Sequence, residues 1–272
     1  MPNPLVRASR SIWRASGVTE GERAIPEETA IALTFNTATY AVMMATPQDL
    51  EDFAVGFSLT EGVISSIDAI DSIDIVEEEI GIELRIWLKA REAVEFLGRR
   101  RKMAGPTGCG LCGIESLTEA MRPPPKVGEG RSFTPAEIMA AIESLSPMQV
   151  LNHETRAVHA AGFYEPKRGL VALREDVGRH NALDKLAGAL ARQGTSAREG
   201  LVVLTSRISI EMVQKAAMIG APVLAAVSAP TALAVRMADA AGMTLIAIAR
   251  KDGFEVFTHP RRVKGKIASH VA

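Results

Sequence analysis

Cysteine is almost absent from this chain, since only Cys109 and Cys112 occur among its 272 residues. Two cysteines cannot form the disulfide framework of a small secreted protein, and such sparing use favours a reducing compartment. Long hydrophobic runs are also absent, because the apolar runs near Leu201 and Leu245 have the length of strands rather than of membrane spans. Residues 1–7 lack the apolar core of a signal peptide. The sequence therefore predicts a soluble, cytoplasmic protein with no membrane partner.

A charge excess of either sign is missing as well. The chain holds 31 basic and 32 acidic residues, so no overall positive field would attract nucleic acid, and we expect no nucleic-acid partner. With 272 residues, of which 47% are hydrophobic, the chain can form one large domain or two modest ones.

Both cysteines lie in one glycine-rich segment, GCGLCG at residues 108–113. Glycines let the backbone turn tightly and leave the sulfur atoms accessible. A helix is predicted over 114–121, and the dipole at its N-terminus favours a thiolate over a thiol. The basic run at 99–102 is either solvated surface or an attractor for an anionic ligand. This pattern favours reactive sulfur chemistry at Cys109 and Cys112.

Other interpretations of the same segment fit less well, and one stays open. A dinucleotide-binding G-x-G-x-x-G needs a buried strand before it, but the preceding residues are basic and then turn-like. A thioredoxin-type cysteine pair needs a βαβ context that the flanking sequence lacks. Inert buried cysteines usually lie in apolar runs. A structural zinc site remains open, because His153 and His159 could complete four ligands.

The N-terminal part predicts a small α+β domain. Residues 24–45 read as strands that place Ile31, Leu33 and Phe35 on one face, and residues 80–88 alternate as a half-buried strand. A helix is expected after Thr46, with Thr46 as its N-cap and Pro47 in its first turn. Its buried face would consist of Leu50, Phe53, Ala54 and Phe57.

A proline-rich stretch at 123–130 resembles a linker. It divides the chain into a predicted domain 1–122, which ends in the cysteine segment, and a predicted domain 123–272.

The second half predicts an α/β fold. Short apolar strands at 201–204, 223–227 and 245–248 alternate with helices at 210–219 and 231–241. Such continuous apolar strands are typical of a sheet that is covered on both faces. A hairpin at 158–173, a helix at 181–190 and an edge strand at 254–257 complete the expected elements.

Polar side chains follow each of the three predicted strands of the second half. They comprise Ser206 and Arg207, then Ser228, and finally residues 249–253. In open α/β sheets ligands bind beyond the carboxyl ends of the strands. Ser209 and Thr231 could cap helices whose free N–H groups suit a phosphate, and Arg207 and Arg250 could clamp the same anion. His259 could face this ligand or solvent. Ordinary capping and turn chemistry explains the serines and threonines equally well.

Residues 176–181 (DVGRHN) concentrate polar side chains before a helix. Asp176 could orient His180 or pair with Arg179, and Asn181 could cap the helix. The segment is as consistent with a structural turn as with a site.

Taken together and in order, several segments resemble the FdhD/NarQ family of formate dehydrogenase accessory proteins. The resemblance spans nearly the whole chain. It is carried by 46–62, the Cys109/Cys112 segment with Glu115-Ser116-Leu117, His159-Ala160-Ala161, residues 176–185, Ser206-Arg207 with Ser209 and 211–213, and Thr258-His259-Pro260.

The resemblance implies a sulfur carrier. A cysteine desulfurase would load a persulfide onto Cys109, with Cys112 assisting, and the sulfur would pass to a bis(molybdopterin guanine dinucleotide) molybdenum cofactor destined for apo formate dehydrogenase. The resemblance also implies a homodimer, and a second domain that is a cytidine-deaminase-like three-layer αβα sandwich with a mixed sheet. It assigns the cofactor to Ile248, Ala249, Arg250, Lys251, Asp252 and Gly253.

Two alternatives concern zinc. A deaminase-type hydrolase needs His-x-Glu followed later by Pro-Cys-x-x-Cys, whereas His159-Ala160-Ala161 lacks the Glu and follows the cysteines. The other alternative is a zinc-stabilised adaptor that links desulfurase and dehydrogenase without carrying sulfur. The carrier hypothesis itself requires no metal ligands.

Overall fold

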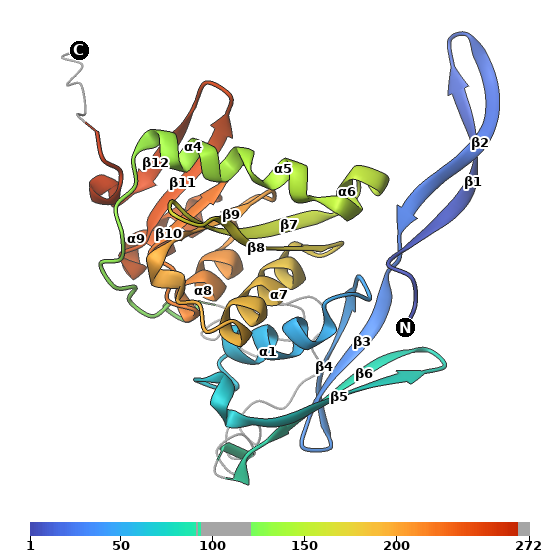
Figure 1. Cartoon of the computed structure of the whole chain (residues 1–272), viewed down its shortest axis with the longest axis horizontal. Helices are drawn as coiled ribbons and strands as arrows, with labels where there is room; N and C mark the ends of the chain where they lie inside the picture. Colours follow the sequence, from blue (N-terminus) through green and yellow to red (C-terminus); the bar gives the residue numbers. More distant parts are fainter. Residues whose placement is uncertain (91, 94–120, 266–272) are drawn as a thin grey trace. The chain divides into compact units, whose positions relative to one another are not determined.

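The computed structural model describes residues 1–90, 92–93 and 121–265, so Cys109 and Cys112 lie outside the described residues (Figure 1). The chain forms two compact units. The first comprises Met1–Arg122, Gln149–Ala160 and Arg174–Arg192, and the second comprises Pro123–Met148, Ala161–Leu173 and Gln193–Ala272. Within the described ranges, no helix is both long enough and apolar enough to span a membrane.

The first unit contains a four-stranded sheet in the order β4-β3-β6-β5. Its strands are β3 (Thr29–Phe35), β4 (Ala38–Ala45), β5 (Ile70–Glu78) and β6 (Gly81–Leu88). The two central strands, β3 and β6, are parallel, and the outer strands pair antiparallel to them. Ile31, Leu33 and Phe35 are fully buried on one face of β3, as the sequence predicts.

Helix α1 (Leu50–Thr60) packs its apolar face into the core of this sheet. The four predicted contact residues, Leu50, Phe53, Ala54 and Phe57, are all buried. A short 3₁₀ turn, η1 (Ile67–Ala69), leads from the helix into β5. The predicted α+β character of this part is confirmed.

A second pair of strands precedes the sheet. Strands β1 (Leu5–Arg14) and β2 (Gly17–Pro26) pair antiparallel over their whole length. No other described strand joins this ribbon, dark blue in Figure 1 and here called the arm. The strands expected from residue 24 onward did not include it, since its side chains are largely exposed and carry little hydrophobic alternation.

Helices from the second half of the sequence also belong to the first unit, so the predicted domain 123–272 is not one compact body. They are α6 (Val150–Thr155) and α7 (Arg179–Arg192). Helices α1 and α7 meet backbone to backbone: a Cβ added to Gly56 would lie 1.6 Å from the carbonyl oxygen of Asp184. This close packing of segments far apart in sequence assigns α7 to the first unit.

The second unit is built on a six-stranded mixed sheet in the order β12-β11-β10-β9-β7-β8. Strands β9, β10 and β11 are parallel, β7 is antiparallel to β9, and β12 is antiparallel to β11. The strands are β7 (His159–Glu165), β8 (Gly169–Asp176), β9 (Leu201–Leu204), β10 (Val223–Ala226), β11 (Thr244–Arg250) and β12 (Gly253–Thr258).

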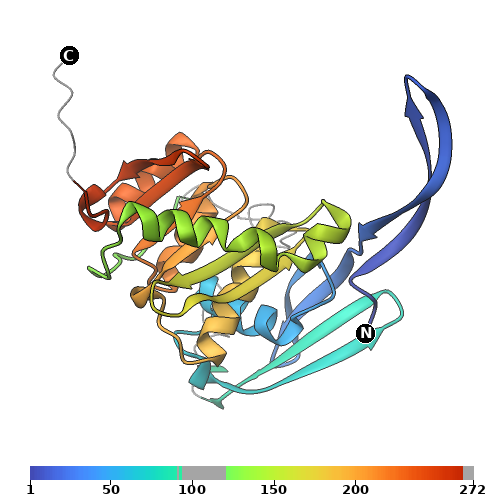
Figure 2. The ribbon, with the colours of Figure 1, turned by 45° about the horizontal axis from the view of Figure 1, so that its top comes forward.

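Both faces of this sheet are covered, as the continuous apolar strands predict. All residues of β9 and β10 are buried, and side chains alternate between the two faces. Helix α4 (Pro135–Glu143) crosses in front of the sheet in Figure 2 and packs Ile138 and Ala141 on it. Helix α9 (Ala232–Ala241) packs on β11 and β12, and α8 (Ile210–Met218) packs on α9.

The remaining elements of the second unit are short: α5 (Leu145–Met148) and the 3₁₀ turns η2 (Ala197–Glu199) and η3 (Pro260–Arg262). The expected α/β class with a mixed sheet is confirmed. A closer likeness to cytidine deaminases stays a prediction.

Candidate functional site

The polar segments that follow β9, β10 and β11 meet at one edge of the sheet. The amide of Val227 donates to Leu204 O at 3.0 Å, and the amide of Ile248 donates to Ser228 O at 3.2 Å. The parallel register pairs Ala226 with Leu204, and Ser228 and Ser206 each lie two residues beyond this pair. The structure therefore brings Ser206, Ser228 and the segment 248–253 together at the carboxyl ends of the strands, where α/β sheets bind ligands.

Backbone strain marks this edge. Ile248 has a φ of +52°, a left-handed conformation that β-branched residues rarely adopt. The pairing of β11 with β12 shifts in register between Ala247 and Arg250, so β11 is irregular at the same point. Strained residues that surrounding structure holds in place cluster at binding sites. This strain makes the end of β11 the best-marked candidate site in the second unit.

The side chain of Arg250 is anchored at this edge. Its Nη1 donates to Val227 O, at the end of the neighbouring strand, and to Ala249 O at 2.9 Å. The residue is exposed, as are Lys251 and Asp252 in the turn that follows. A guanidinium has five N–H donors, so Arg250 keeps donors for a ligand while two carbonyl groups fix its position.

The hydroxyl side chains at this edge take only some of the roles that the sequence predicts. Ser206 is buried and donates to Arg207 O at 3.1 Å, which is local turn chemistry, while the side chain of Arg207 is exposed. Thr231 caps α9 by accepting from the amide of Ala234 at 3.2 Å, as predicted. Ser209 precedes α8 but makes no capping bond, and its buried Oγ has no hydrogen-bond partner within the described chain.

The N–H groups that begin α8 consequently lack a side-chain cap from Ser209. Free N–H groups and the positive end of the helix dipole favour an anion. This helix start follows β9 at the same carboxyl edge as Arg250.

His259 does not join the other predicted binding residues. It follows Thr258, which pairs with Leu245 at the opposite end of β11 from Arg250. Its Nε2 lies 2.9 Å from Asp239 O and 3.2 Å from Asp239 Oδ1, and its carbonyl oxygen accepts from Thr244 Oγ1 at 2.7 Å. Because β12 runs antiparallel to β11, a residue after β12 lies at the amino end of β11, so within one chain His259 cannot face a ligand at the carboxyl edge.

A second polar cluster lies in the first unit, around Asp176 at the end of β8. Its Oδ1 accepts from Gly178 N at 2.7 Å and Asn181 Nδ2 at 3.0 Å. Its Oδ2 accepts from Thr46 N at 3.0 Å and Lys185 Nζ at 2.6 Å. Four donors therefore satisfy both carboxylate oxygens, and Asp176 is fully buried. The ion pair of Asp176 is with Lys185, a partner that the sequence analysis did not name.

Two predicted helix caps are wrong because this cluster recruits their side chains. Asn181 lies inside α7, which begins at Arg179, and its amide also donates to Met44 O at 2.9 Å. Thr46 accepts from Val177 N at 3.1 Å, whereas Asp49 takes the N-cap position of α1 without a side-chain bond. The amide of Thr46 donates to the buried carboxylate of Asp176. Such a charge-assisted hydrogen bond is stronger than the neutral bond that a capping hydroxyl forms. The signal that could have located Lys185 is its i, i+4 spacing from Asn181, which places the two residues on the same face of the helix, one turn apart.

The described residues contain no cluster of side chains that would support the zinc interpretation. His153 is exposed on α6, and His159 begins β7. Within the described ranges no group of three His, Cys, Asp or Glu side chains could hold a metal. Any zinc site that included Cys109 and Cys112 lies outside those ranges and stays a prediction.

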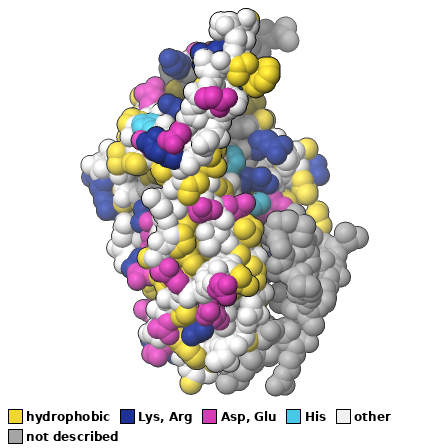
Figure 3. Space-filling view, turned by 90° about the vertical axis from the view of Figure 1, so that its right-hand side faces the viewer, with side chains coloured by type: hydrophobic (Ala, Val, Ile, Leu, Met, Phe, Trp, Pro, Cys, Tyr) yellow, Lys and Arg dark blue, Asp and Glu magenta, His cyan; other side chains and the backbone are white. Residues whose placement is uncertain are grey.

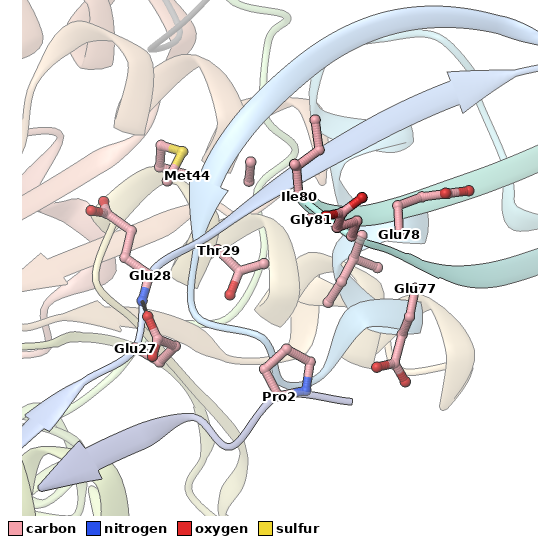
Figure 4. A pocket seen from close by; sticks show the side chains of 12 residues that line it. Pro2, Glu27, Glu28, Thr29, Met44, Glu77, Glu78, Ile80 and Gly81 are labelled. Carbon is pink, nitrogen blue, oxygen red and sulfur yellow. Dashed lines mark hydrogen bonds between the residues drawn. The ribbon is translucent and has the colours of Figure 1, made fainter.

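The described first unit also has an open hollow of about 410 Å³ beside the start of β3 and the β5–β6 turn (Figure 4). Five of the residues that line it are glutamates, namely Glu27, Glu28, Glu77, Glu78 and Glu79, and most of the others are apolar. In the space-filling view, acidic side chains gather on the lower part of the face shown (Figure 3). Like charges repel, so this acidic hollow is unsuited to a phosphate-bearing ligand.

Comparison with known proteins gives a consistent result. Residues 26–264 match the sequence model of the FdhD/NarQ family. The sulfur carrier protein FdhD of Agrobacterium fabrum is 54% identical over 258 residues, covering 94% of this chain and 95% of that protein. The protein of the same name from Cupriavidus necator is 47% identical, covering 93% of this chain and 88% of that protein.

A solved structure extends the likeness to the fold. It is the crystal structure of a putative formate dehydrogenase accessory protein from Desulfotalea psychrophila, 26% identical, with a TM-score of 0.77. The match covers 96% of this chain and all of that one.

Proposed function

Because this chain belongs to the FdhD/NarQ family, we propose that it is the sulfur carrier of a formate dehydrogenase system. In this proposal it takes sulfur from a cysteine desulfurase and delivers it to the bis(molybdopterin guanine dinucleotide) molybdenum cofactor, which is its substrate. It would act in the cytoplasm as a homodimer and dock on the apo form of the dehydrogenase.

The sulfur steps use Cys109 and Cys112. The thiolate of Cys109 attacks the outer sulfur of the desulfurase persulfide; the S–S bond there breaks, a new one forms on Cys109, and the desulfurase cysteine leaves as a thiolate. For delivery, Cys112 attacks the inner sulfur and forms a disulfide with Cys109. The outer sulfur leaves as hydrosulfide for the substrate, and a cellular thiol then reduces the disulfide.

The carboxyl edge of the second unit supports the binding part of the proposal. The observation that carries it is Arg250, held by two carbonyl groups beside the strained Ile248. A fixed guanidinium binds phosphate oxygens at two points, and the start of α8 supplies further N–H donors. Lys251 adds a positive charge to the same turn. A dinucleotide cofactor carries phosphates of the kind this arrangement suits.

Intact mass spectrometry tests the sulfur steps. The full chain is incubated with a cysteine desulfurase and cysteine, and the gain of one sulfur atom is measured for wild type, Cys109→Ala and Cys112→Ala. We expect Cys109→Ala to gain none and Cys112→Ala to retain it. Full sulfur loading of Cys109→Ala would refute the role of that residue. One zinc per chain with no sulfur loading would favour the adaptor alternative instead.

Titration with a guanine nucleotide tests the binding edge. Loss of a charge-assisted hydrogen bond costs about 1.5–3 kcal/mol, so Arg250→Ala should weaken binding by roughly ten- to a hundredfold. Arg168→Ala is the matched control, since Arg168 is also exposed and lies in the β7–β8 turn. Equal affinity of Arg250→Ala and wild type for the nucleotide would show that the ligand does not bind at this edge.

A further inference from the structure

The arm presents two chemically different faces. Side chains alternate along a strand, and directly opposed residues point to the same side. The register opposes Arg7 to Ala24 and Arg10 to Gly21, so these two arginines lie on opposite faces. The Arg10 face carries Arg10, Arg14 and Arg23 with Val6, Ala8, Ile12 and Ile25. Both glutamates of the arm, Glu20 and Glu22, lie on the other face.

The Arg10 face therefore combines cations with apolar side chains. The arm is described in full, and this face of it carries no carboxylate. Val6 and Ile25 are exposed, and near the tip Trp13, on the other face, is 80% exposed. At the base of the arm, Arg23 donates to Thr155 O of α6 at 3.1 Å. A two-stranded ribbon with no further support is marginally stable in water, so the outer part of the arm gains stability from whatever covers it.

The arm lies in front of the part of the chain that the family model matches, which begins at residue 26, where β2 ends. The alignments with single proteins are longer and cover 94% of this chain for the Agrobacterium fabrum protein and 96% for the solved structure, so they include part of the arm. The arm is therefore outside the matched core but not peculiar to this chain.

A complementary surface exists on the same chain. The acidic hollow begins one residue after the arm, at Glu27, and continues across the β5–β6 turn to Glu79. Of the described residues that line it, none is Lys or Arg. Ile80, in the same lining, is 90% exposed and offers an apolar contact. Figure 4 shows carboxylates from the two residues between β2 and β3 and from the β5–β6 hairpin around this hollow.

Building on the homodimer of the proposed function, we propose that the Arg10 face of the arm of one copy binds the acidic hollow of a second copy, and that the second copy reciprocates. Ten residues of strand extend about 33 Å, so each arm can leave its own unit and lie along its partner. The exchange uses the same two surfaces twice, which closes as a two-fold dimer. Opposite charges that face each other across an interface set partner choice and orientation.

A charge exchange tests this interface without reference to sulfur transfer. One full-length variant is Arg10→Glu with Arg14→Glu on the arm. The other is Glu28→Lys with Glu79→Lys in the hollow, chosen because Glu77 pairs with the N-terminal ammonium and Glu78 lies 3.7 Å from Arg85. All four side chains are exposed, so both variants should fold, which circular dichroism checks.

Sedimentation equilibrium then gives the outcome. We expect wild type to be dimeric at micromolar concentration, and each variant alone to raise the dimer dissociation constant by about a hundredfold. An equimolar mixture should recover dimers, because each arm then meets a hollow of opposite charge. The control Arg168→Glu with Arg261→Glu makes the same charge change at exposed sites outside the arm and should stay dimeric.

Each other result overturns the proposal. A monomeric wild type would show that the arm has a different partner. Variants that remain dimeric would place the contact elsewhere on the surface. Dissociation of both variants without recovery in the mixture would show that the arm and the hollow do not meet.

Discussion

Lys185 and Asp176 form an ion pair in which neither side chain has any exposed surface, with 2.6 Å between Nζ and Oδ2. Lys185 Nζ also donates to Thr46 O at 2.8 Å. One ammonium group thus joins α7, the end of β8 and the segment before α1. Full burial of charge is tolerated only when partners satisfy it, as they do here.

Removal of the buried ammonium should destabilise the protein strongly. Lys185→Met leaves the carboxylate of Asp176 buried without its charge partner, which typically costs about 3–5 kcal/mol. Urea unfolding measures the loss. Lys167→Met removes an exposed lysine in the β7–β8 turn and should change stability by no more than about 0.5 kcal/mol. Similar losses for the two variants would contradict the role given to Lys185.

The backbones of α1 and α7 are packed so closely that even one added methyl group at their contact should destabilise the fold. A Cβ at Gly56 would lie 1.6 Å from Asp184 O, and a Cβ at Gly188 would lie 1.9 Å from Asp52 O. Because backbone atoms cannot yield as side chains do, either Gly→Ala change should cost about 3 kcal/mol or more. Gly21→Ala in the arm meets no atom within 4 Å and serves as the control in thermal unfolding. An undiminished melting temperature for Gly56→Ala would refute this close packing.

Glu175 and Glu137 should contribute to stability with opposite pH dependence, because folding shifts their pKa values in opposite directions. Burial raises the pKa of Glu175, although the amides of Leu151 and Asn152 oppose this by donating at 2.8 and 2.9 Å. A carboxyl whose pKa is raised on folding stabilises the fold at low pH and loses that contribution as pH rises through the folded value. The stability of wild type relative to Glu175→Gln should therefore grow as pH falls from 7 toward about 4.5.

Glu137 provides the opposite sign. The backbone N–H of Thr134, which donates to Glu137 Oε2 at 2.7 Å, lowers the pKa of this carboxyl in the capping box of α4. Its contribution is present above the unfolded pKa and disappears as pH falls through the folded value. The stability of wild type relative to Glu137→Gln should therefore shrink below about pH 4. Urea unfolding across this pH range distinguishes the two glutamates, and the same sign for both would contradict the assignment.

Arg262 should anchor the segment that enters the second unit. Its guanidinium donates to Gly128 O at 2.8 Å, Gly242 O at 2.9 Å and Thr244 Oγ1 at 3.1 Å, and its Nε donates to Glu129 O. Burial lowers the pKa of Arg262. Arg262→Met removes hydrogen bonds to three partly buried carbonyl groups and to the buried hydroxyl of Thr244. Leaving the buried hydroxyl without this partner costs about 1–3 kcal/mol.

We expect Arg262→Met to lower the melting temperature and to speed proteolysis near residues 123–130. Arg261→Met removes an exposed neighbour of the same type and should do neither. Equal protease sensitivity of the two variants would show that Arg262 does not hold this segment.

Local patterns explain the parts of the fold that the sequence predicts well. The alternation at Ile31, Leu33 and Phe35 and the helical spacing of Leu50, Phe53 and Phe57 depend on near neighbours in the chain, and all six residues are buried as expected. The positions of α8 and α9 follow from the same kind of periodicity, to within a residue or two.

Predictions that required a distant partner succeeded less often. Threonine is a common helix N-cap, which is why the sequence predicts this role for Thr46. In the structure its backbone amide instead donates to Asp176, 130 residues away. His259 shares the polar character of the strand-end segments, but the antiparallel direction of β12 carries it to the other end of β11. The direction of a strand in a sheet is a property of the assembled sheet, so composition alone could not place this residue.

The amino-acid sequence alone determined the local elements, the family and the confinement of both cysteines to one glycine-rich segment, because each depends on residue type and spacing along the chain. Only the tertiary structure decided that α7 belongs with α1, that Lys185 is the partner of Asp176, and that Arg250 rather than His259 lies at the carboxyl edge. Those outcomes depend on which backbones approach closely enough to exclude a methyl group or water, and no local pattern encodes that distance.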